Sequence, residues 1–485
     1  MTVPWSVYTV SQERRTMDVT FTDGSTESYE DSGFAFGGEG EIFRSRDGKH
    51  AVKLYHPDSS KDSERIRRLD TLIHELNPTR DDPYWSSFFT WPEKRIVKPG
   101  VGFRMQFVAG LKTLENYVLK KAYQRLKPEE RGWFIGRLAC AIKLASAANL
   151  LANMGLCYPD FSGKNIMVDP FEGRTVLIDC DSLTVPGRLS ATVEGTRTFR
   201  APELVSRTVT TPSVKTDRHA LASILYQWLL LWDPLKGDKF FDPDPLQDDI
   251  LRYGKMALYI EHPTDTSNRA SKQVLKAPIL GPELARLFEM AFVDGLHHPD
   301  KRPLPYQWRD ALYHAYDQIT PCASARCEWR FYIATRKSHL TCPACQEPLK
   351  NPKELPFVYL LRHRGTGNPD EYRTDESAAH YVVGWPGRNL YQWHTRPDTS
   401  AAYTDPKNVP DTNPHAAFEY DQRANQWYLK NLSQHDMFYR FSNDVVGMWR
   451  QWPLNTLIAL TDGLSIQFGP APIFFRANVA LVMMG

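Results

Sequence analysis

The chain has 485 residues, 42% of them hydrophobic, which is enough for about three domains of ~150 residues with buried cores. Its 59 basic and 57 acidic residues leave a formal charge of only +2, so the composition gives no reason to expect a nucleic-acid or membrane partner. The first 30 residues lack an apolar segment of signal-peptide length, and the longest apolar run, 220–232, is too short to span a bilayer. These features predict a soluble, cytoplasmic protein.

The first hundred or so residues are typical of short strands around a glycine-rich turn. Strand-like pieces such as 17–22 precede Gly-Phe-Ala-Phe-Gly-Gly-Glu-Gly at 33–40, and we expect them to extend the first sheet. Glycines let a backbone approach phosphate oxygens and point amides at them, although such turns are also common in hairpins. Lys53 follows in the strand-forming run His-Ala-Val-Lys-Leu. A helix is predicted over 60–76, with Asp62 or Ser63 near its start.

A second helix, predicted over 131–154 from its apolar spacing, leads into the stretch 156–183. Strand-like runs at 165–168 and 175–178 are joined by Asp-Pro-Phe-Glu-Gly-Arg, which predicts a hairpin. Asp160 and Asn165 precede this hairpin and Asp179 follows it, so strand pairing brings three oxygen-bearing side chains to one end. Oxygen ligands suit magnesium. Taken alone, the pattern also fits a polar turn beside an ordinary hairpin.

The stretch does not stand alone, because six segments resemble motifs of the protein kinase superfamily in the correct order over roughly residues 31–318. In that family the catalytic aspartate orients the attacking hydroxyl, which implies this role for Asp160. Asn165 and Asp179 would hold magnesium, while Lys53 and the glycine turn would hold the ATP phosphates. Within that turn Gly37 and Gly40 match the family pattern, Gly38 lies between them, and Ala35 replaces the first glycine.

The same resemblance implies roles for further residues. Phe103-Arg-Met-Gln-Phe-Val-Ala-Gly resembles the strand and hinge that receive adenine, with Met105 as gatekeeper. The backbone groups expected to bind the base belong to Gln106, Phe107 and Val108. The glutamate that pairs with Lys53 should lie in the helix 60–76 or at its end; Glu64 and Glu75 are the candidates, and Glu64 is slightly preferred.

Later segments resemble the close of the activation segment and the helices behind it. Gly195-Thr-Arg-Thr-Phe-Arg-Ala-Pro-Glu implies that Thr196 bonds the catalytic aspartate. Asp217 would brace the catalytic-loop backbone at the start of a helix that is buried on all sides. Arg302, in His-Pro-Asp-Lys-Arg-Pro, would pair with Glu203 of Ala-Pro-Glu.

The sequence departs from the family at three places in the catalytic region. Tyr158-Pro159 stands where His-Arg is usual, and Ser162 replaces a lysine, although Lys164 is near. Cys180-Asp181 replaces Phe-Gly, so Asp181 either supplies a further oxygen to the metal or caps the next segment. Pro159 stands where the family has the arginine that binds a phosphorylated activation loop. Activation by loop phosphorylation is therefore not expected. A pseudokinase scaffold and a kinase-fold enzyme acting on a small molecule stay open as alternatives, while the 195–203 motif favours a protein substrate.

Four of the seven cysteines lie close together, at Cys322, Cys327, Cys342 and Cys345. Two close pairs, the second a Cys-Pro-x-Cys knuckle, can bring four thiolates around a structural zinc ion in a ribbon. Free buried cysteines or a redox pair are the alternatives. The other three cysteines are scattered, so no disulfide framework is predicted.

From about residue 355 the sequence changes to short strand-like runs separated by turn residues, which predicts an all-β sandwich. The runs are 357–361, 381–383, 416–420, 426–429, 456–460 and 465–468. Several segments resemble a forkhead-associated domain, a phosphothreonine reader. The resemblance implies that Arg388 meets phosphate, that Thr412 takes the usual serine position and that His415 is structural. The family's Asn-Gly-Thr turn is here His-Asp-Met at 435–437.

We therefore predict an α+β chain with a bilobal protein-kinase-like fold over 1–318, divided near residue 110, a zinc ribbon over 319–350 and a sandwich over 355–485. The resemblance implies an ATP- and magnesium-dependent kinase that phosphorylates Ser/Thr, including its own residues, in a bacterial signalling or stress response. The alternative is a scaffold that binds nucleotide or phosphopeptide without transfer. The combination resembles kinases of tellurite-resistance systems, which implies a cognate phosphatase and a von Willebrand A-domain protein as partners.

Overall fold

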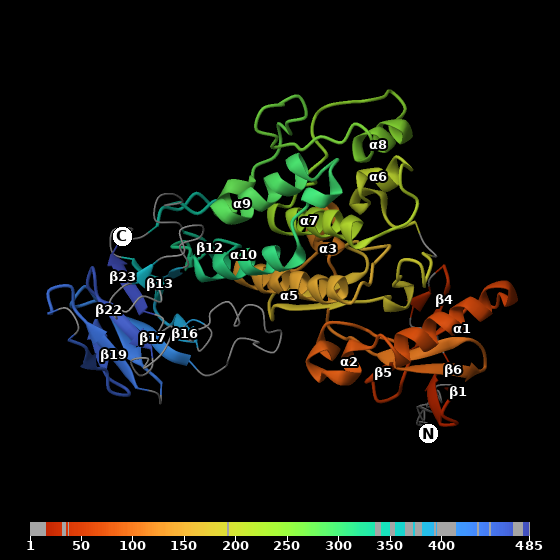
Figure 1. Cartoon of the computed structure of the whole chain (residues 1–485), viewed down its shortest axis with the longest axis horizontal. Coiled ribbons are helices and arrows are strands. Elements are labelled where there is room, and N and C mark those ends of the chain that lie inside the picture. Colours follow the sequence, from red (N-terminus) through yellow and green to blue (C-terminus); the bar gives the residue numbers. More distant parts are fainter. Residues whose placement is uncertain are drawn as a thin grey trace, which may run out of the picture. The chain divides into compact units, whose positions relative to one another are not determined.

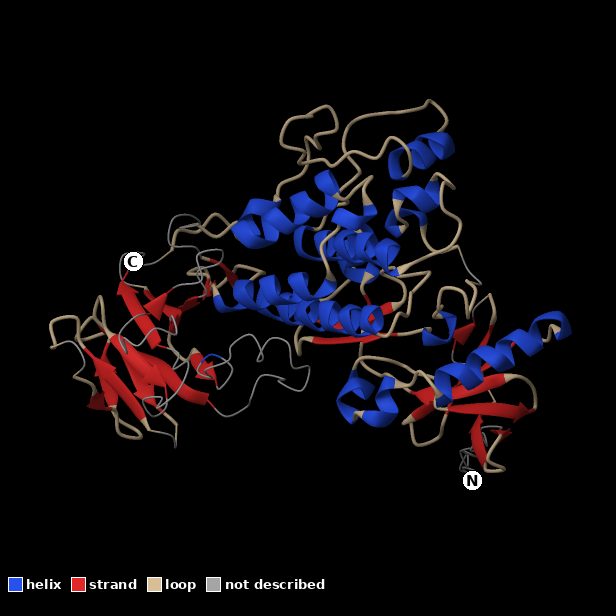
Figure 2. Ribbon diagram, viewed as in Figure 1, coloured by secondary structure: helices blue, strands red, loops and turns tan. Residues whose placement is uncertain are grey.

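The computed structural model describes residues 16–31, 35–36, 38–191, 194–334, 341–349, 355–363, 372–373, 381–391, 394, 414–433, 436–445, 448–468 and 479–484. The chain divides into two compact units. The first contains 1–111 and 176–192, and the second contains 112–175 and 193–485. Helices and strands are mixed in the chain, as the α+β expectation requires (Figures 1 and 2).

The first unit is built on a seven-stranded sheet in the order β2-β1-β6-β7-β5-β4-β3. Its strands are β1 (Thr16–Phe21), β2 (Thr26–Glu30), β3 (Ala35–Phe36), β4 (Gly40–Arg44), β5 (His50–Tyr55), β6 (Lys94–Lys98) and β7 (Gly102–Gln106). Its helical segments are α1 (Ser59–His74), α2 (Pro78–Asp81), η1 (Pro83–Ser87) and η3 (Cys180–Ser182). Buried Val19, Phe21, Phe43 and Val52 form one apolar cluster of this sheet.

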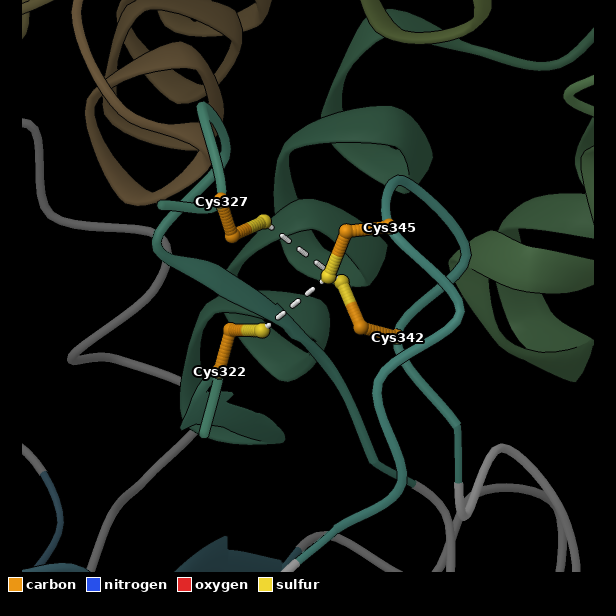
Figure 3. Close-up of side chains that lie close together, drawn as sticks. All are labelled: Cys322, Cys327, Cys342 and Cys345. Atoms are coloured by element: carbon orange, nitrogen blue, oxygen red, sulfur yellow. Dashed lines mark hydrogen bonds between the residues drawn. The ribbon is translucent and has the colours of Figure 1, made fainter. Parts of the chain in front are cut away.

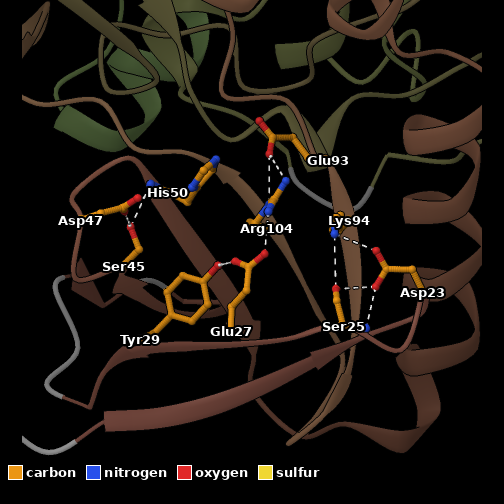
Figure 4. A network of polar contacts seen from close by, with 10 residues as sticks. All are labelled: Asp23, Ser25, Glu27, Tyr29, Ser45, Asp47, His50, Glu93, Lys94 and Arg104. Carbon is orange, nitrogen blue, oxygen red and sulfur yellow. Dashed lines mark hydrogen bonds and ion pairs between the residues drawn. The ribbon is translucent and has the colours of Figure 1, made fainter.

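The β1–β2 hairpin joins this sheet, as predicted for the early strand-like pieces, because β1 pairs with β6. Charged side chains add to this attachment (Figure 4). Arg104 on β7 donates to Glu27 on β2 at 2.7 Å and to Glu93 at 3.1 Å. Lys94 on β6 donates to Asp23 at 2.7 Å. The hairpin is therefore held through its backbone and through its side chains.

Helix α1 lies close to the predicted bounds, but its N-cap differs from the prediction. Asp58 caps it, with its carboxylate accepting from the backbone N–H of Ser60 at 3.2 Å. Asp62, one of the two expected caps, lies in the first turn, where a negative charge favours the helix dipole.

The second unit has two buried helices at its centre, α5 (Phe134–Asn153) and α7 (Val214–Leu230). Both agree with the sequence prediction of long, apolar helices. The helical stretch 128–153 is also apolar enough by length and composition to cross a membrane, but 72% of its most apolar window is buried inside the protein. This burial is typical of a core helix.

Shorter elements surround these two helices. The helical segments are α3 (Glu115–Val118), α4 (Lys120–Tyr123), η2 (Pro128–Glu130), η4 (Arg197–Phe199), α6 (Pro202–Val205), α8 (Pro245–Tyr253), η5 (Ala277–Leu280), α9 (Pro282–Glu289), η6 (Met290–Asp294), η7 (Pro299–Lys301) and α10 (Pro305–Asp317). A small sheet in the order β10-β9-β8 consists of β8 (Lys112–Thr113), β9 (Ile166–Asp169) and β10 (Arg174–Leu177). Its β9–β10 pair is the predicted hairpin.

The last part of the second unit contains two antiparallel sheets that share one apolar core, with Val358, Leu390, Phe418 and Leu429 fully buried. One sheet has the order β14-β13-β23-β22-β19-β20, with β15 on β13, and the other has the order β16-β17-β18-β21. The strands are β13 (Pro356–His363), β14 (Tyr372–Arg373), β15 (Tyr381–Val383), β16 (Asn389–Tyr391), β17 (Pro414–Asp421), β18 (Gln426–Asn431), β19 (Met437–Arg440), β20 (Arg450–Gln451), β21 (Leu457–Ala459), β22 (Ser465–Phe468) and β23 (Val479–Met484). Each of the six predicted strand runs coincides with one of these strands. The preceding segment holds a β-pair, β11 (Ile319–Pro321) with β12 (Phe331–Ile333).

Candidate functional site

In the second unit, Asp160 lies in the turn that precedes the β9–β10 hairpin. Its Oδ1 accepts from the backbone N–H of Thr196 at 2.8 Å and from the Thr196 hydroxyl at 3.0 Å. Its Oδ2 accepts from the Asn165 amide nitrogen at 3.1 Å. Asp160, Asn165 and Thr196 are thus brought together as the sequence predicts. The three hydrogen bonds fix the orientation of the carboxylate, and the bond from Asn165 directs its amide nitrogen to Asp160.

The glycine of the Gly-Thr motif is required by this arrangement. Gly195 adopts a positive φ of 75°, and a Cβ there would lie 2.4 Å from the carbonyl oxygen of Pro159. Only glycine lets the two backbones approach this closely without strain. The close approach places the following residue, Thr196, beside Asp160.

Asp217 on α7 accepts from the backbone N–H of Tyr158 at 2.8 Å, in line with its expected role of bracing the catalytic loop. Burial raises the pKa of Asp217 to about 8, and the Tyr158 hydrogen bond only partly opposes this effect. Folded Asp217 therefore binds its proton more tightly than the unfolded residue, whose pKa is near 3.8. Its contribution to stability is present below about pH 4 and is lost as the pH rises to about 8.

Asp217→Asn should remove this pH dependence, because an amide oxygen can still accept from Tyr158 and carries no charge. Relative to the variant, the wild-type protein should lose about 1 kcal/mol or more of stability between pH 5 and pH 9. Thermal unfolding midpoints of both proteins at the two pH values measure this loss. Parallel pH profiles would show that Asp217 is not protonated in the folded protein.

Arg302 and Glu203 form the predicted ion pair. The Arg302 guanidinium donates to both carboxylate oxygens of Glu203 at 2.8 Å. It also donates to the carbonyls of Gly295, Lys215 and Leu296. The arginine side chain is fully buried, so this network fixes the segment after Thr196 to the helical core.

In the first unit, Lys53 lies on β5 and its ammonium is paired with two carboxylates. Lys53 Nζ donates to Asp179 Oδ1 at 2.7 Å and to Asp181 Oδ2 at 2.8 Å. Asp179 has a left-handed backbone, with φ of 61°. Burial raises the pKa of Asp179, and the neighbouring Asp181 charge adds to this effect. Burial also opposes the charge of Asp181, but Lys53 and Tyr55 outweigh it and lower the pKa of Asp181.

The predicted pairing of Lys53 with Glu64 is wrong for this structure. Glu64 lies 3.5 Å from Arg68 on the same helix, and Glu75, the other candidate, pairs with Arg188. Among the described residues, the carboxylates that bond Lys53 are those of Asp179 and Asp181. Asp181 does not serve as a helix cap either, since Asp179 occupies the N-cap position of η3.

The glycine turn and the predicted hinge lie on either side of β5 in the sheet. Gly40 begins β4, and a Cβ there would lie 2.2 Å from the Leu54 carbonyl oxygen, so strand pairing itself requires this glycine. Gly38 is exposed, and Gly37 lies outside the described residues. Gln106 ends β7 and is exposed, and Val108 is partly buried. The backbone N–H of Phe107 donates to the Lys49 carbonyl at 2.9 Å.

The residues at the positions where the sequence departs from the kinase motifs differ in burial. Pro159 and Ser162 are buried, and the Ser162 hydroxyl has no partner within the described part of the chain. Lys164 is exposed. Burial excludes Ser162 from the role of the lysine that it replaces, whereas Lys164 is free of such a constraint.

The four clustered cysteines of the second unit point their sulfurs toward one another (Figure 3). All four Sγ atoms lie within 4.8 Å of one another, with Cys322 and Cys345 at 3.5 Å and Cys327 and Cys342 at 3.8 Å. A tetrahedral zinc ion with Zn–S bonds of about 2.3 Å places its sulfurs about 3.8 Å apart. The donor set and its spacing therefore fit zinc.

Arg388 is buried, although it directly follows the exposed turn at 386–387. Its Nη2 pairs with Asp317, the last residue of α10, at 3.0 Å, and Asp317 is fully buried. The same Asp317 oxygen accepts from His394 Nε2 at 3.0 Å. The Arg388 side chain is therefore buried and paired, and it is not open to a phosphate from solvent. Thr412 lies outside the described residues.

This placement makes Arg388 a structural link between α10 and the C-terminal sheets. Arg388→Ala should destabilise the chain by about 3 kcal/mol, because the Asp317 carboxylate loses its cationic partner while buried. Thermal unfolding should show the loss, and limited proteolysis should cut earlier around 355–394. Arg423→Ala, which changes an exposed arginine of the same sheets, is the matched control. Equal stability of the two variants would contradict the link.

Tyr55, Asp317 and His394 were not predicted from the sequence. Tyr55 donates to Asp181 at 2.6 Å and lies two residues after Lys53 on β5. Because side chains alternate along a strand, the i,i+2 spacing was the available signal that both residues share a face. Nothing in the local sequence marks Asp317 or His394, whose contacts are distant along the chain.

Part of the chain is similar to known proteins. No protein-family profile matches it. The serine/threonine-protein kinase PknD of Chlamydia muridarum is 28% identical in an alignment of 214 residues that covers 37% of this chain and 22% of that protein. The chain thus matches about a fifth of the length of this curated relative. A solved structure of ROP2 from Toxoplasma gondii, a virulence factor with a protein-kinase fold and no enzymatic activity, covers 62% of this chain and 84% of that chain at 16% identity and a TM-score of 0.44.

Proposed function

We propose that the chain is an ATP- and magnesium-dependent serine/threonine protein kinase that also phosphorylates itself. The sequence similarity to a serine/threonine-protein kinase supports a place in the protein kinase superfamily. The observation that carries the proposal is the setting of Asp160, whose carboxylate is oriented by three hydrogen bonds from Thr196 and Asn165. A carboxylate fixed in this way can accept the proton of a substrate hydroxyl.

The remaining chemistry is assigned to residues that match the kinase motifs. Lys53, with the glycine turn, would bind the nucleotide phosphates, and the hinge 106–108 would bind adenine. Glu64 has no part in this assignment, because it pairs with Arg68. Phosphoryl transfer depends mainly on positioning and charge neutralisation, so the fixed orientation of each charged group is the main contribution of the protein.

Magnesium is assigned to Asn165, Asp179 and Asp181. The donor set is oxygen-rich, as magnesium prefers. Asp181 Oδ1 is buried and has no partner in the described part of the chain, so it is an atom that a cation can satisfy. The Asn165 amide nitrogen donates to Asp160, which leaves its amide oxygen as the ligand atom. Bound magnesium would neutralise charge on the phosphates.

The other parts of the chain extend the proposal. A zinc ion would hold the cysteine segment, and the C-terminal sheets, whose sequence resembles a forkhead-associated domain, would contact a protein partner. The buried setting of Arg388 favours a contact that does not depend on phosphate. A protein substrate in the cytoplasm of a bacterium, a cognate phosphatase and a von Willebrand A-domain protein belong to the same proposal, on the resemblance to tellurite-resistance kinases.

The test is incubation of the purified chain with labelled ATP and magnesium, with and without a generic basic protein. The expected result is label on the chain itself and on the added protein, and no label when Lys53 is replaced by Met. Nucleotide binding without transfer to any protein would instead support the pseudokinase alternative. Transfer to a small molecule alone would reject a protein substrate.

A further inference from the structure

The ammonium of Lys53 is held by a carboxylate that the sequence did not assign to it. Lys53 is paired with Asp179 and with Asp181 at nearly equal distances, 2.7 and 2.8 Å. The two acids differ in burial, because the Asp181 side chain is 2% exposed and that of Asp179 is 33% exposed. Asp181 is therefore the partner that is shielded from water, where an ion pair is stronger.

Tyr55 fixes the orientation of Asp181. Its hydroxyl donates to Asp181 Oδ2 at 2.6 Å, the same oxygen that accepts from Lys53. Lys53 and Tyr55 are i and i+2 on β5, so one face of one strand presents both donors to one carboxylate oxygen. A lysine ammonium is a point charge on a flexible stem, so a fixed anion is needed to hold it in one place.

The acidic residues of helix α1 are engaged elsewhere. Each of its described acid–base pairs uses an arginine or a lysine other than Lys53: Asp58–Lys61 at its cap, Asp62–Arg65, Glu64–Arg68, Asp70–Arg95 and, just after it, Glu75–Arg188. The helix therefore supplies no anchor for Lys53 in this structure.

We propose that Asp181, oriented by Tyr55, is the positioning residue that holds Lys53 for the nucleotide phosphates. This inference rests on the proposed function. Asp179 is assigned to magnesium, and its charge is then shared with the metal. Asp181 Oδ2 would keep Lys53 in place in that state. Asp181 Oδ1, which accepts no hydrogen bond from the described residues, is left as the metal ligand. The Tyr55–Asp181 pair thus takes over the role expected of a helix glutamate.

The first test is the ATP dependence of phosphoryl transfer by full-length variants. Asp181→Asn should lower kcat about tenfold or more and raise KM for ATP about threefold or more, since Lys53 loses the charge-assisted hydrogen bond that holds it for the nucleotide phosphates. Tyr55→Phe should lower kcat several-fold. The double variant should be no slower than Asp181→Asn, because Tyr55 acts through Asp181. Glu64→Gln should have a smaller effect than either single variant, and Asp70→Asn, on the same helix, is the neutral control.

Two outcomes of this test would overturn the inference. One is a loss in Glu64→Gln as large as that in Asp181→Asn. The other is multiplication of the Tyr55→Phe and Asp181→Asn effects in the double variant.

The second test is calorimetric titration with magnesium and ADP, which needs no transfer. Tyr55→Phe removes only the hydroxyl group and leaves the net charge unchanged. Its effect therefore cannot come from the loss of a charge at the site. The substitution should weaken ADP binding about threefold or more in the wild-type background and by a clearly smaller factor in the Asp181→Asn background, where Tyr55 no longer orients an anion. If the wild-type protein binds ADP but transfers no phosphate, the kinase proposal fails, and this coupling still decides the role of Tyr55 and Asp181. A chain that binds no nucleotide overturns both.

Discussion

Asp160→Asn is expected to lower kcat for phosphoryl transfer at least about 100-fold, because a positioned acid or base typically contributes 10²–10⁴-fold. The asparagine cannot accept the substrate proton. In the wild-type protein Thr196 and Asn165 both donate to the Asp160 carboxylate. The amide nitrogen of the new asparagine cannot accept, so one of these two hydrogen bonds is lost. Nucleotide affinity should change by less than about threefold, since Asp160 has no assigned contact with ATP. Steady-state kinetics and nucleotide titration measure the two effects.

A matched control exists on the hairpin that follows. Asp169 at the end of β9 accepts from the backbone N–H groups of Phe171 and Glu172, which an asparagine oxygen can also do. Asp169→Asn should therefore retain wild-type kcat. Asp179→Asn should differ from both variants by weakening magnesium-dependent nucleotide binding. An Asp160→Asn variant that folds and keeps its kcat would exclude Asp160 from catalysis.

The elements that hold Asp160 could be predicted because their signals are local. The hairpin, the helix that becomes α5 and the helix that becomes α7 each depend on residues within about twenty positions. Asp160, Asn165 and Thr196 were predicted together from the family resemblance, and the structure brings them within hydrogen-bond distance. The contact between the Gly195 backbone and the Pro159 carbonyl also explains the glycine of this motif, because a Cβ on residue 195 would clash with that carbonyl.

The partners of Lys53 and Arg388 could not be predicted, because they depend on tertiary packing. The Lys53–Asp181 pair joins residues 128 positions apart, and the Arg388–Asp317 pair joins residues 71 positions apart. The sequence offered Glu64 and Glu75 as partners for Lys53, with Glu64 slightly preferred, and a loop position for Arg388. Local capping chemistry was also ambiguous, since acidic and hydroxyl residues are crowded over 58–63, and it is Asp58, with its extended backbone, that forms the N-cap.

The cysteine segment gives the prediction with the largest expected effect on stability. Cys342→Ser should release zinc, because three thiolates and a hydroxyl make a poorer tetrahedral site than four thiolates. Structural zinc can contribute ~10 kcal/mol or more to folding a small metal domain. Elemental analysis should find one zinc ion per wild-type chain and far less in the variant.

The structure also indicates where the loss should spread. Cys327 and Cys342 belong to a small apolar cluster with Tyr332, against which Trp329 packs. Trp329 stacks on Phe134 at 4.6 Å, and its carbonyl accepts from the Phe134 backbone N–H at 3.0 Å, at the start of α5. Without zinc this cluster loses its cross-link, so protease cleavage should appear first within 319–349. The start of α5 should then lose its contact with Trp329.

Cys140→Ser is the matched control, because Cys140 is buried on α5 and lies outside the cluster. Its sulfur faces the carbonyls of Asp169 and Arg174, to which a serine hydroxyl can donate. This variant should keep its zinc and its protease resistance. Full zinc content in Cys342→Ser would place the metal elsewhere, and zinc loss in both variants would trace the effect to general unfolding. Loss in Cys342→Ser alone, with early cleavage confined to 319–349, is the result that the four converging sulfurs predict.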